Sequence, residues 1–169
     1  MEALEAIHTR RSIRQYEDRP VPAETVERLL AAAMMAPSAR NAQPWHFVVI
    51  DDRATLDHIA EINLNAEMAR RARLAILVCA DLSLELSAGY WVVDCAAATQ
   101  NMLLAAHALG LGAVWTGIYP RQERMETIGN LAGLPRYVKA HSLIVIGYPA
   151  EHRASEERYR PERVHRNRW

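Results

Sequence analysis

Three arginines and one serine lie within five residues near the start of the chain, in the segment Arg10-Arg11-Ser12-Ile13-Arg14. Guanidinium groups this close repel one another, and each can bind a phosphate through two parallel hydrogen bonds. The Ser12 hydroxyl adds a donor without charge. The pattern therefore indicates a site for the phosphate of a nucleotide or flavin. The alternative is a solvated arginine-rich turn paired with Glu17 and Asp18.

Two further segments combine polar and aromatic side chains. In Ala36 to Trp45, the side chains of Ser38, Asn41 and Gln43 offer donors and acceptors, which suit a flat heteroaromatic ring with carbonyl and N–H edges. The alternative is a plain polar loop. The segment Trp115-Thr116-Gly117 lies at the end of a predicted strand, where ligands of layered sheets bind, although a tryptophan there also fits a core position.

Several familiar chemistries are excluded by their missing motifs. The chain has no GxxxxGK[ST] sequence and a single lysine, Lys139, which excludes a P-loop. Gly110-Leu111-Gly112 precedes a predicted strand, whereas a dinucleotide-binding fingerprint follows one. Neither HExxH nor GxSxG occurs, so we expect no metal site and no serine nucleophile. An enzyme of this kind leaves the difficult chemistry to a bound cofactor.

Hydrophobic periodicity and turn residues predict the elements that position these segments. The expected helices are 2–8, a helix that opens near Pro22 and stops before Pro37, then 54–62, one within 88–109, and 121–131. The expected strands are 46–50, 74–80, 113–116 and 141–146, followed by a polar, arginine-rich tail, 150–169. The apolar run 74–80 predicts a strand covered on both faces. The order of elements indicates an α+β or α/β sheet layered with helices.

Composition limits the class of protein. The chain has 169 residues, 20 basic and 20 acidic side chains and 50% hydrophobic residues, so we expect one globular domain, 1–169. Zero formal charge argues against partners such as nucleic acid or an anionic membrane surface. Polar residues interrupt the stretch 88–109, which favours a buried helix over a membrane span. Cys79 and Cys95 fit buried thiols, and the N-terminal residues lack a signal-peptide core, so we expect a cytoplasmic protein.

Four segments in this order resemble the nitroreductase family of flavin-dependent oxidoreductases. They are RRSIRQY near the N-terminus, APSARNAQPWHFVVI, GAVWTGIYP, and LIVIGYP before a basic tail. The set spans nearly the whole chain and is most similar to the short members of the family. The resemblance implies a nitroreductase-like α+β fold with a central, mostly antiparallel sheet. It also implies a homodimer with two FMN sites at the interface and a C-terminal tail that extends onto the partner subunit.

The resemblance also implies roles for individual residues. Arg10, Arg11 and Ser12 would bind the FMN phosphate and ribityl chain, and Arg14 would lie near the flavin N1 and stabilise its developing negative charge. The ring would be contacted by Asn65, with Asn63 as an equal candidate. The other expected ring contacts are Pro37, Ser38, Asn41 and Gln43, placed on the other subunit, and Trp115, Thr116 and Gly117. Arg158 would complete the phosphate site, with Arg160 and Arg168 as alternatives.

The implied activity is electron transfer from NADH or NADPH, by a ping-pong mechanism, to nitroaromatic, quinone or similar acceptors. Alternatives within the same superfamily are a reductive dehalogenase and an enzyme that fragments its own flavin. Both usually require a lid or additional residues around the ring, and the stretch 62–73 leaves little room for a lid. A remote alternative is an arginine-rich binding module. The sequence leaves the physiological acceptor, the choice between NADH and NADPH, and the openness of the site undecided.

Overall fold

The computed structural model describes residues 1–169. Its four strands form one sheet in the order β1-β2-β4-β3, with every neighbouring pair antiparallel. The strands are β1 (Trp45–Ile50), β2 (Leu74–Asp81), β3 (Gly112–Gly117) and β4 (Val138–Gly147). The α-helices are α1 (Ala3–Thr9), α2 (Ala23–Met34), α3 (Arg53–Ile62), α4 (Trp91–Ala108) and α5 (Gln122–Leu131). Short 3₁₀ helices are η1 (Ala39–Asn41), η2 (Leu64–Arg70), η3 (Leu82–Leu84) and η4 (Pro161–Arg163).

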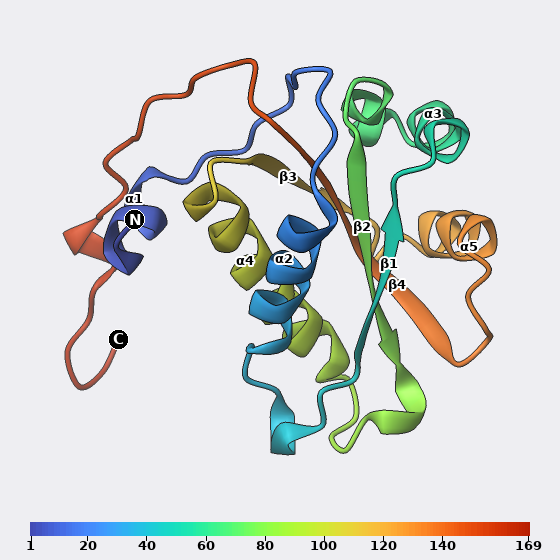
Figure 1. The fold of residues 1–169 in the computed structure, drawn as a ribbon. Helices are drawn as coiled ribbons and strands as arrows, with labels where there is room; N and C mark the ends of the chain where they lie inside the picture. The colour runs from blue at the N-terminus through green and yellow to red at the C-terminus, as the bar shows by residue number, and fades with distance from the viewer.

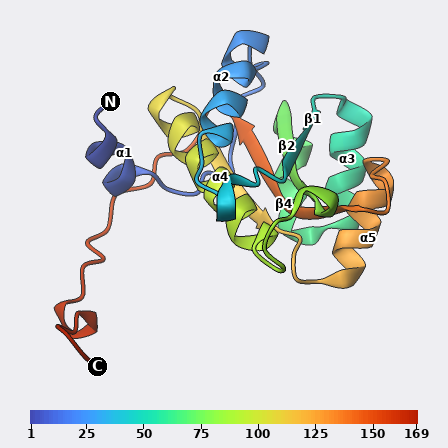
Figure 2. The same ribbon diagram turned by 90° about the horizontal axis from the view of Figure 1, so that it is seen from below.

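Helices cover both faces of the sheet (Figures 1 and 2). The antiparallel pairing of all its strands confirms the predicted α+β class. Alternate residues of β2 point to opposite faces because the side-chain period of a strand is two. Ile76 and Val78 join the core beneath α2 and α4, whereas Ala75 and Leu77 join the core beneath α3, η2 and α5. The predicted strand covered on both faces is therefore confirmed.

Local signals explain where the elements begin and end. The Asp52 carboxylate accepts a hydrogen bond from the Thr55 N–H at 2.8 Å and caps the start of α3. Gly110 follows α4 with φ +77°, the left-handed conformation that ends helices. All predicted helices and strands are present in the predicted order. The short helix η2, between Ile62 and Leu74, was not predicted.

The helix α4 supports the expectation of a core helix within 88–109. Seven of its residues are buried, among them Cys95 and Met102. None of the helices is both long and apolar enough to span a membrane. The other cysteine, Cys79, is buried in β2, and both thiols are free, as expected.

The arginine-rich segment lies along the outer edge of β3. The Ile13 N–H donates to the Ala113 carbonyl at 3.1 Å, and the Tyr16 hydroxyl donates to the Ile13 carbonyl at 2.6 Å. A Cβ on Gly112 would lie 2.6 Å from Ile13 Cγ2, so only glycine allows this approach. Because Ile13 and Tyr16 pack inward, Arg14 between them is directed away from the core.

The tail after β4 is exposed and leaves the body of the molecule. Figures 1 and 2 show it passing α1 and then running away from the sheet. Arg11 holds its first part, since Nε donates to the Ala154 carbonyl at 3.2 Å and Nη2 to the Glu156 carbonyl at 3.3 Å. The last residue, Trp169, is 99% exposed and stacks only on His165. The docking of this tail on a partner stays a prediction.

Candidate functional site

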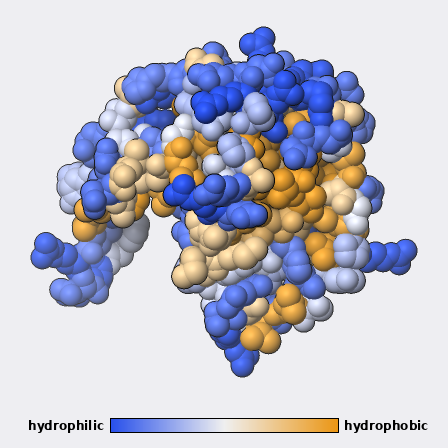
Figure 3. All heavy atoms as spheres, viewed as in Figure 1, coloured by the Kyte–Doolittle hydropathy of each residue, from blue (hydrophilic) through white to orange (hydrophobic).

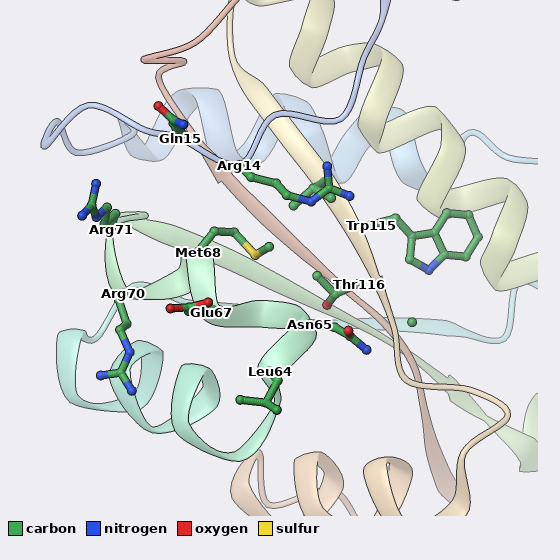
Figure 4. Close-up of a pocket in the computed structure, with 12 residues that line it drawn as sticks. Arg14, Gln15, Leu64, Asn65, Glu67, Met68, Arg70, Arg71, Trp115 and Thr116 are labelled. Carbon is green, nitrogen blue, oxygen red and sulfur yellow. The ribbon is translucent and has the colours of Figure 1, made fainter. Parts of the chain in front are cut away.

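A cavity of about 830 Å³ lies between η2 and β3, below the segment that carries Arg14 (Figure 4). This volume is within the range of roughly 300–1,000 Å³ that is typical of small-molecule and cofactor sites. The sequence-predicted residues that line it are Arg14, Asn65, Trp115, Thr116 and Gly117. The other lining residues are Gln15, Leu64, Glu67, Met68, Arg70, Arg71 and Val114.

The β3 wall of the cavity is fixed by the pairing of β3 with β4. Thr116 lies opposite Leu143, and its hydroxyl donates to the Leu143 carbonyl at 2.9 Å. The single hydrogen of the Thr116 hydroxyl is therefore used within the sheet, and toward a ligand this hydroxyl can act only as an acceptor. We had expected the hydroxyl to contact the flavin ring. Trp115, which alternates with Thr116 along the strand, is 37% exposed.

An aromatic cluster supports Trp115 from behind. The His141 ring lies 5.7 Å from the Trp115 ring and stacks against Tyr119 with an interplanar angle of 13°. Burial lowers the pKa of His141 to about 4, so the imidazole is neutral at physiological pH. Neutral His141 and the rings around it hold Trp115 in place at the cavity without adding charge.

The position of Arg14 is set through its backbone. The Glu151 carboxylate accepts hydrogen bonds from the N–H of Arg14 at 2.6 Å and of Gln15 at 3.1 Å. These bonds and one from the Arg153 side chain hold the pKa of Glu151 below its ordinary value. The Arg14 guanidinium itself has no carboxylate within ion-pair distance, so its charge is available to the cavity.

A second group of cations forms around Arg10. The pKa of Arg10 is lowered by burial first, and then by the neighbouring charges of Arg11 and Arg158. Arg10 has no acidic partner, and a cluster of this kind is stabilised by a bound anion. Arg11 donates to four backbone carbonyls, two at the end of α1 and two in the tail, so it connects the tail to α1. Arg158 contacts Glu156 at 3.3 Å.

The two asparagines that sequence reasoning left as equal candidates have different positions. Asn63 is 3% exposed and its Oδ1 accepts a hydrogen bond from the Asn65 N–H at 3.2 Å, so it caps η2. Asn65 lines the cavity. Of the two, only Asn65 is placed to contact a ligand there.

The loop between α2 and β1 does not reach the cavity within one chain. Figure 1 shows this loop and η1 at the opposite end of the sheet from η2. The Ala39 N–H donates to the Asp94 carboxylate of α4 at 2.9 Å, and the Gln43 N–H donates to Ser38 Oγ at 3.0 Å. Pro37, Ser38, Asn41 and Gln43 are therefore gathered in a separate, ordered loop.

Sequence reasoning missed the contribution of η2. Its charged residues Glu67 and Arg70, with Arg71 directly after it, line the far end of the cavity (Figure 4). The signal was present in the run of small and charged residues AEMARRAR. Ala66, Ala69 and Ala72 of this run are buried at a spacing of three, which is the 3₁₀ period. Such a short, alanine-rich run has no strong hydrophobic pattern.

The donor set fits a planar anionic cofactor such as FMN. It combines the aromatic ring of Trp115, the amide of Asn65, the unpaired cation of Arg14 and the cluster of cations around Arg10, which could bind an anion. Both thiols are in the sheet core, and burial raises the pKa of Cys79 to about 12, so neither supplies a nucleophile to the cavity. No three histidine, cysteine or acidic residues are grouped so that they could hold a metal ion.

Comparisons with known proteins identify the family and the fold. The model of the Nitroreductase family matches residues 7–85 and 63–148. A protein of Methanothermobacter thermautotrophicus is 50% identical over 169 residues, covering 100% of this chain and 88% of its own length. A crystal structure from Parabacteroides distasonis has a TM-score of 0.95 at 41% identity, with 99% of this chain and 98% of that chain covered. Both bear the name "Putative NADH dehydrogenase/NAD(P)H nitroreductase".

A third protein, from Desulfovibrio desulfuricans, was solved in complex with FMN. Its TM-score is 0.86 at 36% identity, and the match covers 100% of this chain and 98% of that chain. Because the family model spans most of the chain and relatives at this identity match its whole length, the chain belongs to the nitroreductase family.

Proposed function

We propose that this chain is an FMN-dependent oxidoreductase that passes electrons from NADH or NADPH to nitroaromatic, quinone or similar acceptors by a ping-pong mechanism. The observation that most supports this proposal is the cavity between η2 and β3, which Arg14, Asn65 and Trp115 line together. The FMN-bound relative and the name of the archaeal relative support the same conclusion. The whole chain, 1–169, would act as one FMN-binding domain, and its two free thiols fit a reducing, cytoplasmic address.

Arg10, Ser12 and Arg158 would hold the FMN phosphate. The pKa of Arg10 is lowered by burial and then by the neighbouring charges of Arg11 and Arg158, and a dianionic phosphate would relieve this repulsion. Arg11 would contribute charge, but its side-chain hydrogen bonds go to backbone carbonyls at the end of α1 and in the tail. Arg158 is favoured over Arg160 and Arg168 because its charge acts on Arg10 in the single chain.

Arg14 would stabilise negative charge on the reduced flavin. When bound, FMN supplies the redox chemistry by accepting hydride from the nicotinamide and passing electrons to the acceptor. Arg14 offers an unpaired positive charge at the cavity, and its backbone N–H is held by Glu151. A positive charge at the place where negative charge develops stabilises that charge. Trp115 and the aromatic side chains behind it would keep water from one side of the ring.

The second half of the site would come from a partner copy of the chain. Contacts to the ring by Pro37, Ser38, Asn41 and Gln43 of the partner subunit would explain why this chain holds an ordered polar loop far from its own cavity. Figure 3 shows apolar side chains gathered over the middle of the face on which α2 and α4 lie.

Exposed apolar residues support such a homodimer. Leu4 and Ile7 of α1, Met35 after α2 and Val93 of α4 are each more than half exposed. Helix α4 buries seven of its residues in this chain, and a second copy would cover its exposed apolar residue Val93. The tail with Trp169 would extend onto the partner.

The visible absorption spectrum of the purified protein tests the proposal, followed by anaerobic addition of NADPH and, separately, NADH. We expect a two-banded flavin spectrum that bleaches with at least one nucleotide, and the faster donor identifies the coenzyme. A protein that is colourless and does not bind added FMN would contradict the cofactor. Bound flavin that neither nucleotide bleaches would favour the dehalogenase or flavin-fragmenting alternatives.

A further inference from the structure

One arginine outside the cavity connects its two walls. Arg124, in the first turn of α5, donates from Nη1 to the Gly117 carbonyl of β3 at 3.2 Å. On its other side the guanidinium faces the side-chain amide of Asn65 in η2. None of the sequence motifs includes Arg124, and it does not line the cavity itself.

The chemistry of Arg124 determines which end of the Asn65 amide faces it. A guanidinium has only donors, so it can pair with the amide oxygen and not with the amide nitrogen. With Oδ1 turned toward Arg124, this oxygen accepts from Nη1 and Nη2 at 2.8 and 2.8 Å. This orientation is a half-turn of the amide from the one drawn in Figure 4. The opposite orientation sets N–H donors against N–H donors.

The backbone of Asn65 is held independently of its side chain. Asn63 is buried, and its Oδ1 accepts from the Asn65 N–H at 3.2 Å. Asn65 is thus fixed by Asn63 at the main chain and by Arg124 at the amide oxygen. The group left for a ligand is Nδ2, which has two hydrogens to donate and no lone pair to offer.

We propose that Arg124 is a positioning residue, which turns the Asn65 amide so that Nδ2 donates to the polar edge of the flavin ring. The inference rests on the proposed binding of FMN in this cavity. It specifies the chemistry of the contact, because Asn65 then recognises an acceptor atom of the ring, a carbonyl oxygen or an unprotonated nitrogen, and not a ring N–H. The same guanidinium fixes the distance between η2 and β3 through Gly117.

The most discriminating variant is Asn65→Asp. Its carboxylate keeps, and strengthens, the acceptor pair with Arg124, so the thermal stability of the apoprotein should be unchanged or higher. It removes the donor to the flavin and sets a negative charge against an acceptor atom, so we expect FMN affinity to fall roughly tenfold or more. If the amide oxygen instead faced a ring N–H, Asn65→Asp would bind FMN at least as tightly as the wild type.

Arg124→Met tests the positioning role directly. We expect FMN affinity, measured by fluorescence titration of apoprotein, to fall roughly three- to tenfold. Arg124→Lys should recover part of this loss, since a lysine makes one of the two bonds. In an Asn65→Ala background, Arg124→Met should cause no further loss of affinity, a result that a merely structural role would not produce. Arg121→Met, an exposed arginine just before α5, is the matched control and should bind FMN normally.

The outcomes separate this inference from the proposed function. If the wild type and the Arg121→Met control bind FMN and the Asn65→Asp variant binds it equally well, the Arg124 inference is wrong and the proposed function stands. The Arg124 inference would also be overturned if Arg124→Met reduced FMN affinity by the same factor in the wild type and in the Asn65→Ala background. A wild type that binds no FMN would overturn both.

Discussion

The cavity wall of η2 and β3 and the loop 37–43 are both polar and ordered, but they differ in what they face. The wall residues meet inside one chain, where Glu151 and the β3–β4 pairing position Arg14 and Thr116. The loop residues are equally well held, by the Ser38 hydroxyl and the Asp94 carboxylate, yet they face away from that cavity. Under the proposed function, the wall and the loop would be halves of two different FMN sites, which a second copy of the chain would join.

The largest effect is expected in mixed dimers, which test whether the cavity wall and the loop 37–43 of one FMN site come from different chains. Arg10→Ala removes a charged phosphate contact and should weaken FMN binding roughly 100-fold, and Asn41→Ala should weaken it roughly tenfold from the loop half. A dimer of one Arg10→Ala chain and one Asn41→Ala chain contains one site with both defects and one intact site. Titration with FMN should therefore recover tight binding at half the wild-type stoichiometry.

The matched control for this experiment is Arg28→Ala, an exposed arginine of α2 that should leave FMN binding unchanged. If the mixed dimers show no tight site, the two halves act within one chain and the division is wrong.

A smaller effect, on the reduction potential of the flavin, is expected from Arg14→Met, which changes only the cavity and not the loop 37–43. The fold should be retained, because the position of Arg14 depends on backbone hydrogen bonds to Glu151. Loss of its charge should make the flavin harder to reduce, with the midpoint potential lower by about 30 mV, which corresponds to about 1.4 kcal/mol for two electrons. Arg71→Met removes a cavity arginine at the far end and should shift the potential less. An unchanged potential in Arg14→Met would show that Arg14 does not tune the flavin.

The smallest effect is expected from Glu151→Gln, which alters the carboxylate that accepts hydrogen bonds from the backbone of Arg14 and Gln15. The pKa of Glu151 is lowered in the folded protein, so its ionised form stabilises the fold above the ordinary pKa of 4.5. That contribution is lost as pH falls through the lowered folded value. We expect the variant to melt roughly 2–4 °C below the wild type at pH 7, with the difference disappearing at pH values well below 4.5. A difference that is independent of pH would show that the carboxylate charge is not involved.

The sequence predicted the fold well because its strongest signals are local. The apolar run of β2 and the glycine after α4 each indicated an element and its end without knowledge of the rest of the chain. The weak signal was η2, whose buried alanines follow a three-residue period over a single short segment. Hydrophobic patterns do not identify such segments.

The candidate site was predictable in its types of residue and less so in its geometry. The motifs contain Arg14 and Trp115, and the family resemblance added Asn65 with Asn63 as an equal candidate; Arg14, Asn65 and Trp115 line one cavity. The roles of Glu151 and Arg124 were not predictable, because each acts across a long stretch of chain on a residue that it does not neighbour in sequence. The bond from the Thr116 hydroxyl to Leu143 likewise depends on strand register.

The central claim is that a dimer completes an FMN site that one chain only half contains. Size-exclusion chromatography with light scattering and visible absorbance measures the mass and the flavin content of the same species. We predict a single species of twice the 19.1 kDa chain mass that carries one FMN per chain. A 19.1 kDa monomer that retains FMN, or a dimer that elutes without flavin after loading, would contradict the claim.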